Sequence, residues 1–189
     1  MFRIKIWFFY FLCVYCFSTI SIADNYNLIR KDSFLKVKAT YLVFFSINGY
    51  FKDFEGDIKW DKANLSNSFF KGKAKIADLT TGISAIDKQL YSSRFFDIEQ
   101  YPYIYIESTK IKHLEGNLYE VEAFLTVKNI TQKITERLTV FEDESQPGIV
   151  YFSATIKLKR NEFNLTNNLT HFIVDNTVKV SLLFKAEKK

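Results

Sequence analysis

Apolar and polar residues alternate with period two along most of this 189-residue chain. In the run from 54 to 60, for example, Phe54, Ile58 and Trp60 share one phase and charged residues occupy the other. Side chains of a strand point alternately to its two faces, so this pattern predicts strands with one apolar and one wet face. About eight such runs follow one another between residues 33 and 184, joined by short polar connections. The chain is therefore expected to form one antiparallel sheet with a single apolar interior.

Closing such a sheet removes its edges, and a barrel of about eight strands either fills itself with side chains or encloses one small ligand. The apolar phase of this chain mixes small and large residues. Its small members are Gly49, Gly56, Gly72, Ala74, Ala123 and Ala154, and its large ones include Phe51, Trp60 and Phe152. This mixture fits both a self-packed core and a barrel with room for a guest. We predict an all-β fold, an antiparallel barrel of about eight strands with one helical lid segment.

The lid is predicted from the one segment with helical spacing, within residues 80–108. Ile83, Ile86 and Leu90 recur at steps of three and four residues, and Tyr91 widens the same face. After residue 97 the pattern changes, and a strand follows Pro102. We expect the segment 83–96 to cap one end of the barrel, to control access to it, and to cover Phe95 and Phe96.

The first 23 residues have the features of a cleaved signal peptide. Arg3 and Lys5 form a basic start, residues 7–20 are apolar, and Ser21 and Ala23 place small side chains before a cleavage point. A retained membrane anchor is the alternative, although the apolar stretch is short for a span. Cleavage after Ala23 leaves residues 24–189 as one domain without cysteine, because both cysteines precede that point. We therefore expect an exported, periplasmic protein that is stabilised by packing alone.

Charge and chemistry argue against several functional classes. Without Arg3 and Lys5, 24 basic and 21 acidic residues remain, and the basic ones are spread singly as on solvated strand faces. This distribution excludes a nucleic-acid-binding stripe. Asp97 and Glu99 are expected to be solvated loop residues, and His113 and His171 have no acidic neighbours at metal-ligand spacing. The sequence thus predicts no enzyme activity, no metal and no catalytic cofactor.

Arg160 is an exception to the apolar pattern. It continues the phase of Phe152 and Ile156, so its charge is expected inside the barrel or at its mouth, where it needs a partner. Glu136, on the inner phase of its own run, and Asp175 are the candidates. We expect Arg160 to close one end of the barrel structurally rather than to contact a ligand headgroup.

The order and spacing of short motifs resemble those of the YceI-like exported proteins, also called polyisoprenoid-binding proteins. The resemblance begins near Tyr26, Asp32 and Ser33 and covers almost all of residues 24–189. The further matching positions are Gly49, Phe51, Phe54, Gly56, Thr81, Gly82, Asp87, Leu90, Phe95, Phe96, Asp97, Tyr101, Pro102, Ser108, Leu125, Thr126, Arg160, Phe163, Val174, Asp175 and Val178. Histidines common in the family are replaced here by Asp32 and Gln89 and near Ala39, so no role of theirs carries over. The resemblance implies an extended, lipocalin-like barrel with a long apolar tunnel for an isoprenoid or similar lipid.

From the pattern and the resemblance together, we expect a non-catalytic periplasmic carrier of a long-chain amphiphilic lipid, such as a polyprenyl chain or a quinone tail. A transient membrane contact and a homodimer are compatible with this role. The residues expected to bind the lipid are Leu35, Val37, Phe51, Trp60, Ile76, Phe95, Phe96, Ile106, Leu125, Leu138, Phe152, Ile156, Arg160, Leu182 and Phe184. The alternative is a stress-linked interaction protein with a self-packed barrel that binds a partner through outward Tyr103, Tyr105 and Phe124.

Overall fold

A computed structural model describes residues 23–42, 44–165 and 174–189, so the predicted signal peptide falls almost entirely outside the described residues. Strands dominate the chain, and consecutive neighbours in the sheet are antiparallel. The strands are β1 Asp24–Leu28, β2 Phe34–Tyr41, β3 Phe45–Phe51, β4 Phe54–Trp60, β5 Phe69–Lys75, β6 Leu79–Thr80, β7 Tyr103–Glu115, β8 Leu118–Val127, β9 Ile130–Glu142, β10 Ile149–Lys159 and β11 Val174–Lys188. The helix α1 covers Ser84–Tyr91.

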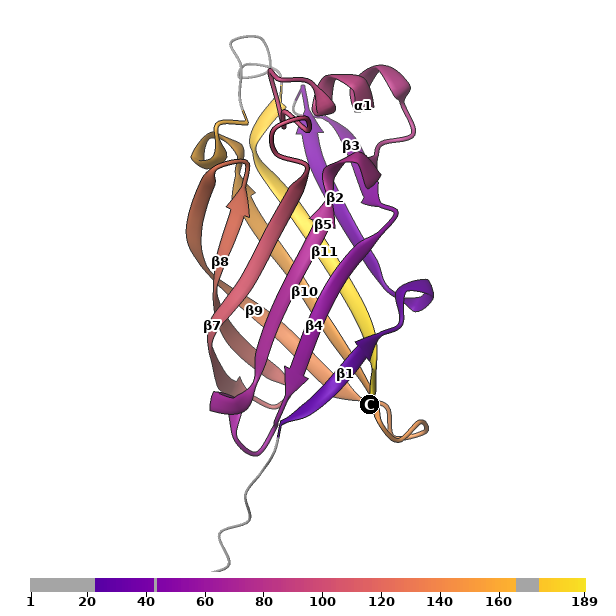
Figure 1. Ribbon diagram of the computed structural model, residues 1–189, viewed down its shortest axis with the longest axis vertical. Helices are drawn as coiled ribbons and strands as arrows, with labels where there is room; N and C mark the ends of the chain where they lie inside the picture. The colour runs from indigo at the N-terminus through magenta and orange to yellow at the C-terminus, as the bar shows by residue number, and fades with distance from the viewer. Residues whose placement is uncertain (1–22, 43, 166–173) are drawn as a thin grey trace, which may run out of the picture.

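Eight of these strands close into a barrel. The order β1-β4-β5-β7-β8-β9-β10-β11 returns to β1 through the pairing of Tyr26–Leu28 with Ala186–Lys188. Figure 1 shows the strands tilted around a long barrel with α1 across its upper end. The predicted all-β barrel of about eight strands with one helical segment is thereby confirmed.

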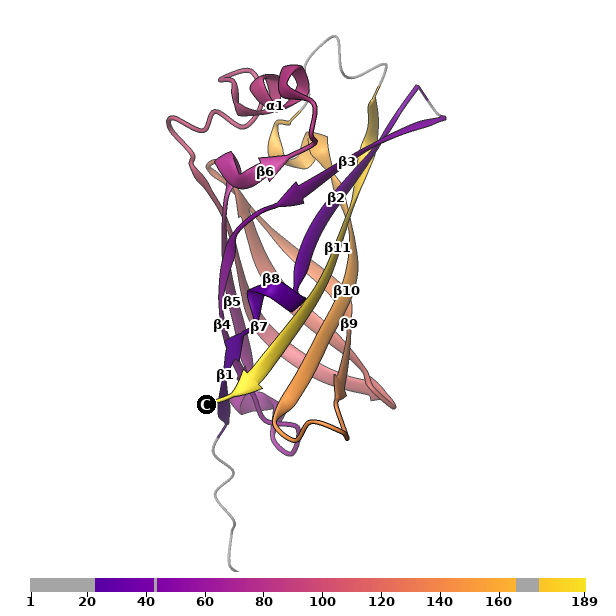
Figure 2. The ribbon, with the colours of Figure 1, turned by 90° about the vertical axis from the view of Figure 1, so that its right-hand side faces the viewer.

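Three strands extend the barrel at the end that α1 covers. β2 pairs with β11 beyond β1, β3 pairs with β2, and the short β6 pairs with the end of β3. A register shift between Val174 and Val178 of β11 accompanies the pairing with β2. Such irregularities bend a sheet locally, and Figure 2 shows the β2–β3 hairpin leaning outward from the barrel at this end.

The turns predicted from polar interruptions separate the long strands as expected. β7 and β8 join through residues 116 and 117, with Gly116 at a φ of 51°, and β8 and β9 join through residues 128 and 129. The 143–148 loop connects β9 to β10. Because a left-handed backbone favours glycine, Gly116 suits its tight turn. These connections keep β7 to β10 in one antiparallel meander.

The wall of the barrel has an incomplete seam. Within the described residues, the ladder between β9 and β10 covers Leu138–Glu142 against Val150–Ala154 and stops there, although both strands continue toward the α1 end. Above that point side chains bridge the seam: Gln132 Nε2 donates to the Glu162 carbonyl at 3.3 Å, and the Glu136 carboxylate accepts a hydrogen bond from the Lys157 backbone. The seam therefore lacks part of the backbone bonding that closes the other junctions.

Two buried clusters lie at different heights in the barrel. The cluster at the end away from α1 centres on aromatic rings: Trp60 packs edge-on against Tyr119 and Phe152, with centroids 4.9 and 5.8 Å away, and Phe70 packs against Phe152. The other cluster lies beneath the lid and includes Phe51, Phe54, Ile76, Leu79, Phe95, Phe96, Leu125, Val127, Phe163 and Leu165. The open space of the barrel lies between them.

The helical segment differs from its prediction in one respect. Ile86, Leu90 and Tyr91 are half-buried on the face toward the barrel, but Ile83 precedes the helix as its N-cap residue and is exposed. The helix begins one residue later than the spacing suggested because Ile83 has an extended backbone, with φ −117° and ψ 101°. Ile76 likewise lies just beyond β5, in a 3₁₀ turn over Ile76–Asp78, rather than in the strand.

Candidate functional site: the interior of the barrel

The barrel encloses a cavity of about 840 Å³. This volume is near the upper end of the roughly 300–1,000 Å³ that small-molecule sites occupy. Its lining is overwhelmingly apolar and is drawn from every strand of the barrel wall, with contributions from β2, β3, β6 and α1. The side chains of the protein therefore do not fill the interior of its barrel. The alternative of an interaction protein with a self-packed barrel assumes that they do.

Several inward side chains stay partly accessible because they face this space. Ala154, Leu182 and Val180 lie on the inner phase of adjoining strands, yet all three are only half-buried. Ala123, by contrast, is buried among its neighbours. The wall formed by β10, β11 and β2 thus presents an apolar surface to the cavity.

The inward glycines serve two different purposes. A Cβ added at Gly49 would meet Leu79 Cδ1 at 2.9 Å, and one at Gly72 would meet Ile106 Cγ2 at 2.9 Å. These two positions are small because neighbouring side chains already lie over them. At Gly56 the nearest described atom is the Lys71 carbonyl oxygen at 3.5 Å, so a methyl group would fit. Small residues in the pattern therefore do not by themselves mark free volume.

The lid is tied down through a hydrogen-bond network around Asp87. Its carboxylate accepts from the Thr81 backbone N–H at 2.8 Å, the Thr81 hydroxyl at 2.6 Å and the Thr80 hydroxyl at 2.7 Å. Burial acts to raise the pKa of the Asp87 carboxyl, but the bonds from Thr81 and Thr80 outweigh it and hold the pKa below its usual value. Gly82, at a φ of 76°, makes the turn that brings these groups together.

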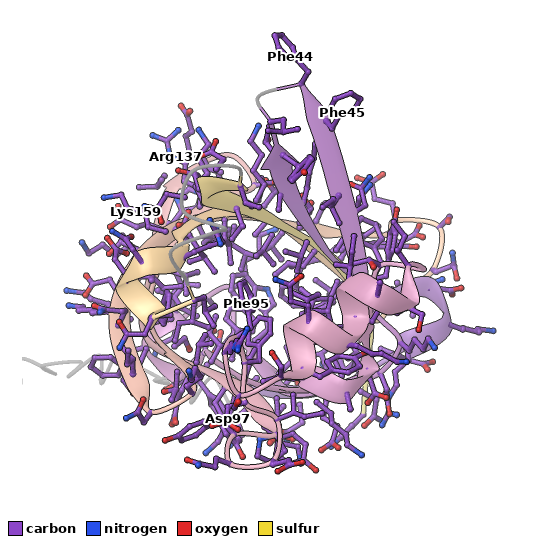
Figure 3. All side chains as sticks on the ribbon, turned by 90° about the horizontal axis from the view of Figure 1, so that it is seen from above. Phe44, Phe45, Phe95, Asp97, Arg137 and Lys159 are labelled. Atoms are coloured by element: carbon purple, nitrogen blue, oxygen red, sulfur yellow. The ribbon has the colours of Figure 1, made fainter. Side chains whose placement is uncertain are left out.

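The rings of Phe95 and Phe96 and the phenol group of Tyr91 complete the cover over the upper end of the cavity. Phe95 and Phe96 are buried and pack edge-to-face with centroids 5.3 Å apart. The Tyr91 hydroxyl donates to the carbonyl oxygens of Leu79 and Ala77, which fastens the end of α1 to β6 and the turn before it. Figure 3, looking down on this end, shows Phe95 near the centre of the barrel beside α1. The lid and its anchors thus cover the upper end of the cavity.

Arg160 lies at the same end and is 5% exposed. Its Nε, Nη1 and Nη2 atoms donate to the carbonyl oxygens of Asp175, Leu165 and Val174 at 2.9, 3.1 and 2.8 Å. Burial lowers the pKa of this guanidinium, and the charge of Asp175 counteracts that effect. The side chain therefore joins the turn after β10 to the start of β11, a structural arrangement that occupies its donors.

Glu136 brings a carboxylate into the cavity wall beside the seam. Burial raises the pKa of this carboxyl, against a backbone hydrogen bond from Lys157 and the charge of that lysine. Glu136 and Lys157 lie on β9 and β10, above the last paired residues of the two strands. Arg137 and Lys159, on the same two strands, also border the cavity and are labelled in Figure 3. The seam thus places three charged side chains at the border of a largely apolar cavity.

The structure places most of the fifteen sequence-predicted residues around this one space. Those that line the cavity are Leu35, Val37, Phe51, Phe95, Phe96, Ile106, Leu125, Leu138, Phe152, Ile156, Arg160, Leu182 and Phe184. Trp60 and Ile76 are not among the lining residues. Trp60 belongs to the aromatic cluster at the far end, and Ile76 is wholly buried beneath the lid.

Sequence reasoning missed other lining residues. Ala39, Ile47 and Val178 line the part of the cavity that the leaning hairpin forms, and Leu165 lies beneath the lid. Ala39, Ile47 and Val178 were on the inner phase of their runs, so the alternation contained the signal for them. Leu165 lies beyond the strand that carries Phe152 and Ile156. Because it is outside any strand, the alternation of apolar and polar residues could not predict it.

The described residues offer no grouping of side chains for a metal ion. Within them, no three His, Cys, Asp or Glu side chains gather where a metal ion could bind. His113 is exposed and shares a 2.9 Å hydrogen bond with the Gly116 carbonyl, whereas His171 lies outside the described residues. In the part of the chain that the structure describes, no helix is long and apolar enough to cross a bilayer.

Comparison with known proteins places this architecture in a family. A family model described as a YceI-like domain matches residues 26–186. A UPF0312 protein of Photorhabdus laumondii is 29% identical over 154 residues, covering 79% of this chain and 80% of that protein. A UPF0312 protein of Pseudomonas putida is 29% identical over 150 residues, covering 77% and 78%.

Solved structures share the fold at lower sequence identity. BcnA of Burkholderia cenocepacia superposes with a TM-score of 0.79 at 22% identity, covering 84% of this chain and 99% of BcnA. A polyisoprenoid-binding domain from Saccharophagus degradans gives a TM-score of 0.70 at 14% identity, covering 88% and 99%. These similarities establish the barrel architecture.

Proposed function

The chain belongs to the YceI-like family, and from that premise we propose that it is a non-catalytic carrier of a long-chain isoprenoid or similar amphiphilic lipid. The similar fold of a polyisoprenoid-binding domain supports a lipid ligand. The signal-peptide features of residues 1–23 support action in the periplasm after export. A polyprenyl chain or a quinone tail would enter the barrel, with no other cofactor.

The single observation that carries this proposal is the apolar cavity of about 840 Å³ inside the barrel. Transfer of a lipid chain from water into such a space is favourable by roughly 0.8 kcal/mol per buried methylene. Ten enclosed methylenes would therefore contribute about 8 kcal/mol before the cost of ordering the chain is subtracted. Side chains along the wall offer shape but few hydrogen bonds, so selectivity along the lipid chain would be loose.

Polar recognition would be concentrated where polar groups meet the cavity. The hydrogen bonds of Arg160 to three backbone carbonyls occupy its guanidinium, which leaves the seam as the better site for a headgroup. There Glu136 faces the cavity, and Arg137 and Lys159 border it. We expect a headgroup with a hydroxyl or carbonyl oxygen to lie at this seam, with the chain along β10 and β11.

The test is native mass spectrometry of the protein purified from its own cell compartment, followed by organic extraction. An extra mass that extracts as one long-chain lipid supports the proposal and identifies the ligand class. A bare chain mass together with no uptake of added isoprenoid alcohol would contradict it.

A pair of variants at adjacent positions locates the bound lipid. Ala154→Phe places a ring in the cavity, whereas Ser153→Phe places the same ring on the opposite face of β10. We expect the first variant to lose most of its lipid uptake and the second to retain it. Equal uptake by two folded variants would exclude the cavity as the binding site.

A further inference from the structure

The tip of the β2–β3 hairpin carries large apolar side chains in water. Phe44 is 88% exposed, Phe45 64% and Leu42 46%. Turn tips of soluble hairpins usually carry Gly, Asn, Asp or Pro, and here Leu42 even occupies a left-handed backbone position with a φ of 48°. In Figure 3 Phe44 and Phe45 lie beyond the outline of the barrel and point away from it. Nothing in the barrel's own packing requires these rings.

The same hairpin forms part of the cavity wall. Ala39, Tyr41 and Ile47 line the cavity from β2 and β3, and the exposed tip begins directly after Tyr41. The hairpin leans outward at the end of the barrel that α1 covers (Figure 2). An apolar path therefore runs from the interior of the barrel, along one face of the hairpin, to its exposed tip.

A row of cations lies below the tip. Lys38 of β2 pairs across the sheet with Lys179 of β11, which pairs in turn with Lys157 of β10. All three lysines are exposed, and none of them forms an ion pair within the described residues. Like charges placed side by side on a sheet repel one another, so the row suits a negatively charged surface. Lys38 is four residues from Leu42, roughly 13 Å along the strand.

We propose that the β2–β3 hairpin is a membrane-docking element, which inserts Leu42, Phe44 and Phe45 into the surface of a bilayer containing anionic lipids. Interfacial elements bury apolar side chains about 5–10 Å deep while basic residues remain at the headgroups. The separation of roughly 13 Å between Lys38 and Leu42 lets the tip insert to such a depth while the lysine row stays at the headgroups. Docking would bring the cavity wall formed by the hairpin against the membrane.

A second copy of the chain suits the tip less well than a membrane. Three partly exposed side chains offer roughly 400 Å² together, since a fully buried Phe covers about 150–250 Å². A specific protein interface buries about 800 Å² on each partner. The adjoining lysine row would also repel an identical row in a symmetric dimer. A bilayer requires neither a minimum interface area nor a facing lysine row, because each ring that inserts contributes its own favourable free energy of transfer.

The role of docking in lipid transfer rests on the proposed carrier function, but docking itself does not. The test uses flotation of the purified protein with vesicles of phosphatidylcholine and phosphatidylglycerol. A double variant, Phe44→Ser with Phe45→Ser, removes the two rings, and Phe124→Ser is the matched control. Phe124 is 47% exposed on the outer face of β8, away from the hairpin.

We expect the double variant to partition about a hundredfold more weakly into vesicles, since each inserted ring contributes substantially to partitioning, and Phe124→Ser to partition as the parent does. Lys38→Glu with Lys179→Glu should weaken binding to these vesicles but not to vesicles of phosphatidylcholine alone. Equal partitioning of the double variant and the parent, or no flotation of the parent, would overturn the proposal. A parent dimer that the double variant converts to a monomer would instead assign the tip to a second copy.

Uptake of isoprenoid alcohol from detergent separates this inference from the carrier function. If the double variant takes up dispersed alcohol normally but extracts it slowly from vesicles, both the docking role and the carrier function are supported. If neither the parent nor the double variant takes up the alcohol, while the parent still floats through its two rings, the carrier function fails and the docking inference stands.

Discussion

The Asp87 carboxylate on α1 accepts both the backbone N–H and the hydroxyl of Thr81, at 2.8 and 2.6 Å. The pair joins the helix to the segment between β6 and α1, and with the Thr80 hydroxyl it satisfies the carboxylate almost completely. A charged acceptor with three donors is a strong local constraint. The lid is thus held by polar anchors at its start and by Phe95 and Phe96 beneath its end.

Removal of this anchor should loosen the lid before it unfolds the barrel. We expect Asp87→Ala to lower the free energy of local opening of the lid by about 1–3 kcal/mol, because the donors of Thr80 and Thr81 lose a charged acceptor. Amide hydrogen exchange should accelerate over residues 83–96 and remain unchanged in β7 to β10. Lys88→Ala, at an exposed position of the same helix, is the control. Uniform acceleration throughout the barrel would contradict a local role for Asp87.

Acid should have the same local effect as this substitution. Because the folded pKa of Asp87 is depressed, its stabilising contribution is present above the unfolded value of about 3.9 and is lost as pH falls through the folded pKa. Proteolysis or hydrogen exchange of the lid segment should therefore increase in acid in the parent. The Asp87→Ala variant should lack this component of the pH dependence.

Glu136 should behave in the opposite sense. Its folded pKa is raised, chiefly by burial, so the ionised carboxylate destabilises the barrel above that pKa. This cost diminishes as pH falls through the folded pKa toward the unfolded value of about 4.3. We expect Glu136→Gln to raise the free energy of unfolding at pH 7 by about 1 kcal/mol, since a neutral amide costs less to bury.

Urea denaturation at several pH values measures this effect. Glu144→Gln, in the exposed 143–148 loop, is the control and should leave the midpoint unchanged. If Glu136→Gln destabilises the protein at pH 7, the carboxylate and its backbone bond from Lys157 instead hold the seam closed.

Arg160 supports a prediction about folding rather than ligand binding. We expect Arg160→Met to lower the free energy of unfolding by about 3 kcal/mol, because three buried or partly buried carbonyl oxygens lose their donors. Arg160→Lys should recover only part of that loss, since an ammonium group lacks the planar fork that meets all three. Thermal unfolding with a lipid-uptake assay on the folded fraction measures this. Normal stability with lost uptake would show that Arg160 acts on the ligand instead.

How far the sequence predicts this structure depends on what period-two alternation encodes. It records which face of the sheet a side chain occupies, so Leu125, Ile156 and Leu182 were assigned to the interior and lie there. It does not record height along the barrel axis. Trp60 and Phe152 share the inner phase, yet only Phe152 lines the cavity, because Trp60 lies deeper in the aromatic cluster.

Features that depend on how strands pair could not be predicted from the alternation of apolar and polar residues. The run of β9 alternates normally through Ile134 and Glu136, and nothing in it signals that pairing with β10 stops at Leu138. The outward lean of β2 and β3 likewise arises with the irregular register between Val174 and Val178. The exposed rings of Phe44 and Phe45 could not be distinguished from core residues by composition alone.

Trp60 substitutions should affect the stability of the protein without affecting lipid uptake, because Trp60 packs in the aromatic cluster and does not line the cavity. Its indole Nε1 is buried and has no hydrogen-bond partner among the described residues, although the ring packs against Tyr119 and Phe152. Trp60→Phe keeps an aromatic ring and removes a buried, unpaired donor that costs about 1–3 kcal/mol. This gain opposes the loss of packing, so we expect the stability to change by less than about 1 kcal/mol, whereas Trp60→Ala should cost about 3–5 kcal/mol. Because Trp60 does not line the cavity, the phenylalanine variant should take up lipid as the parent does. Denaturation and lipid uptake measured together check both points, and a stable Trp60→Phe protein with impaired uptake would show that Trp60 itself acts on the bound lipid.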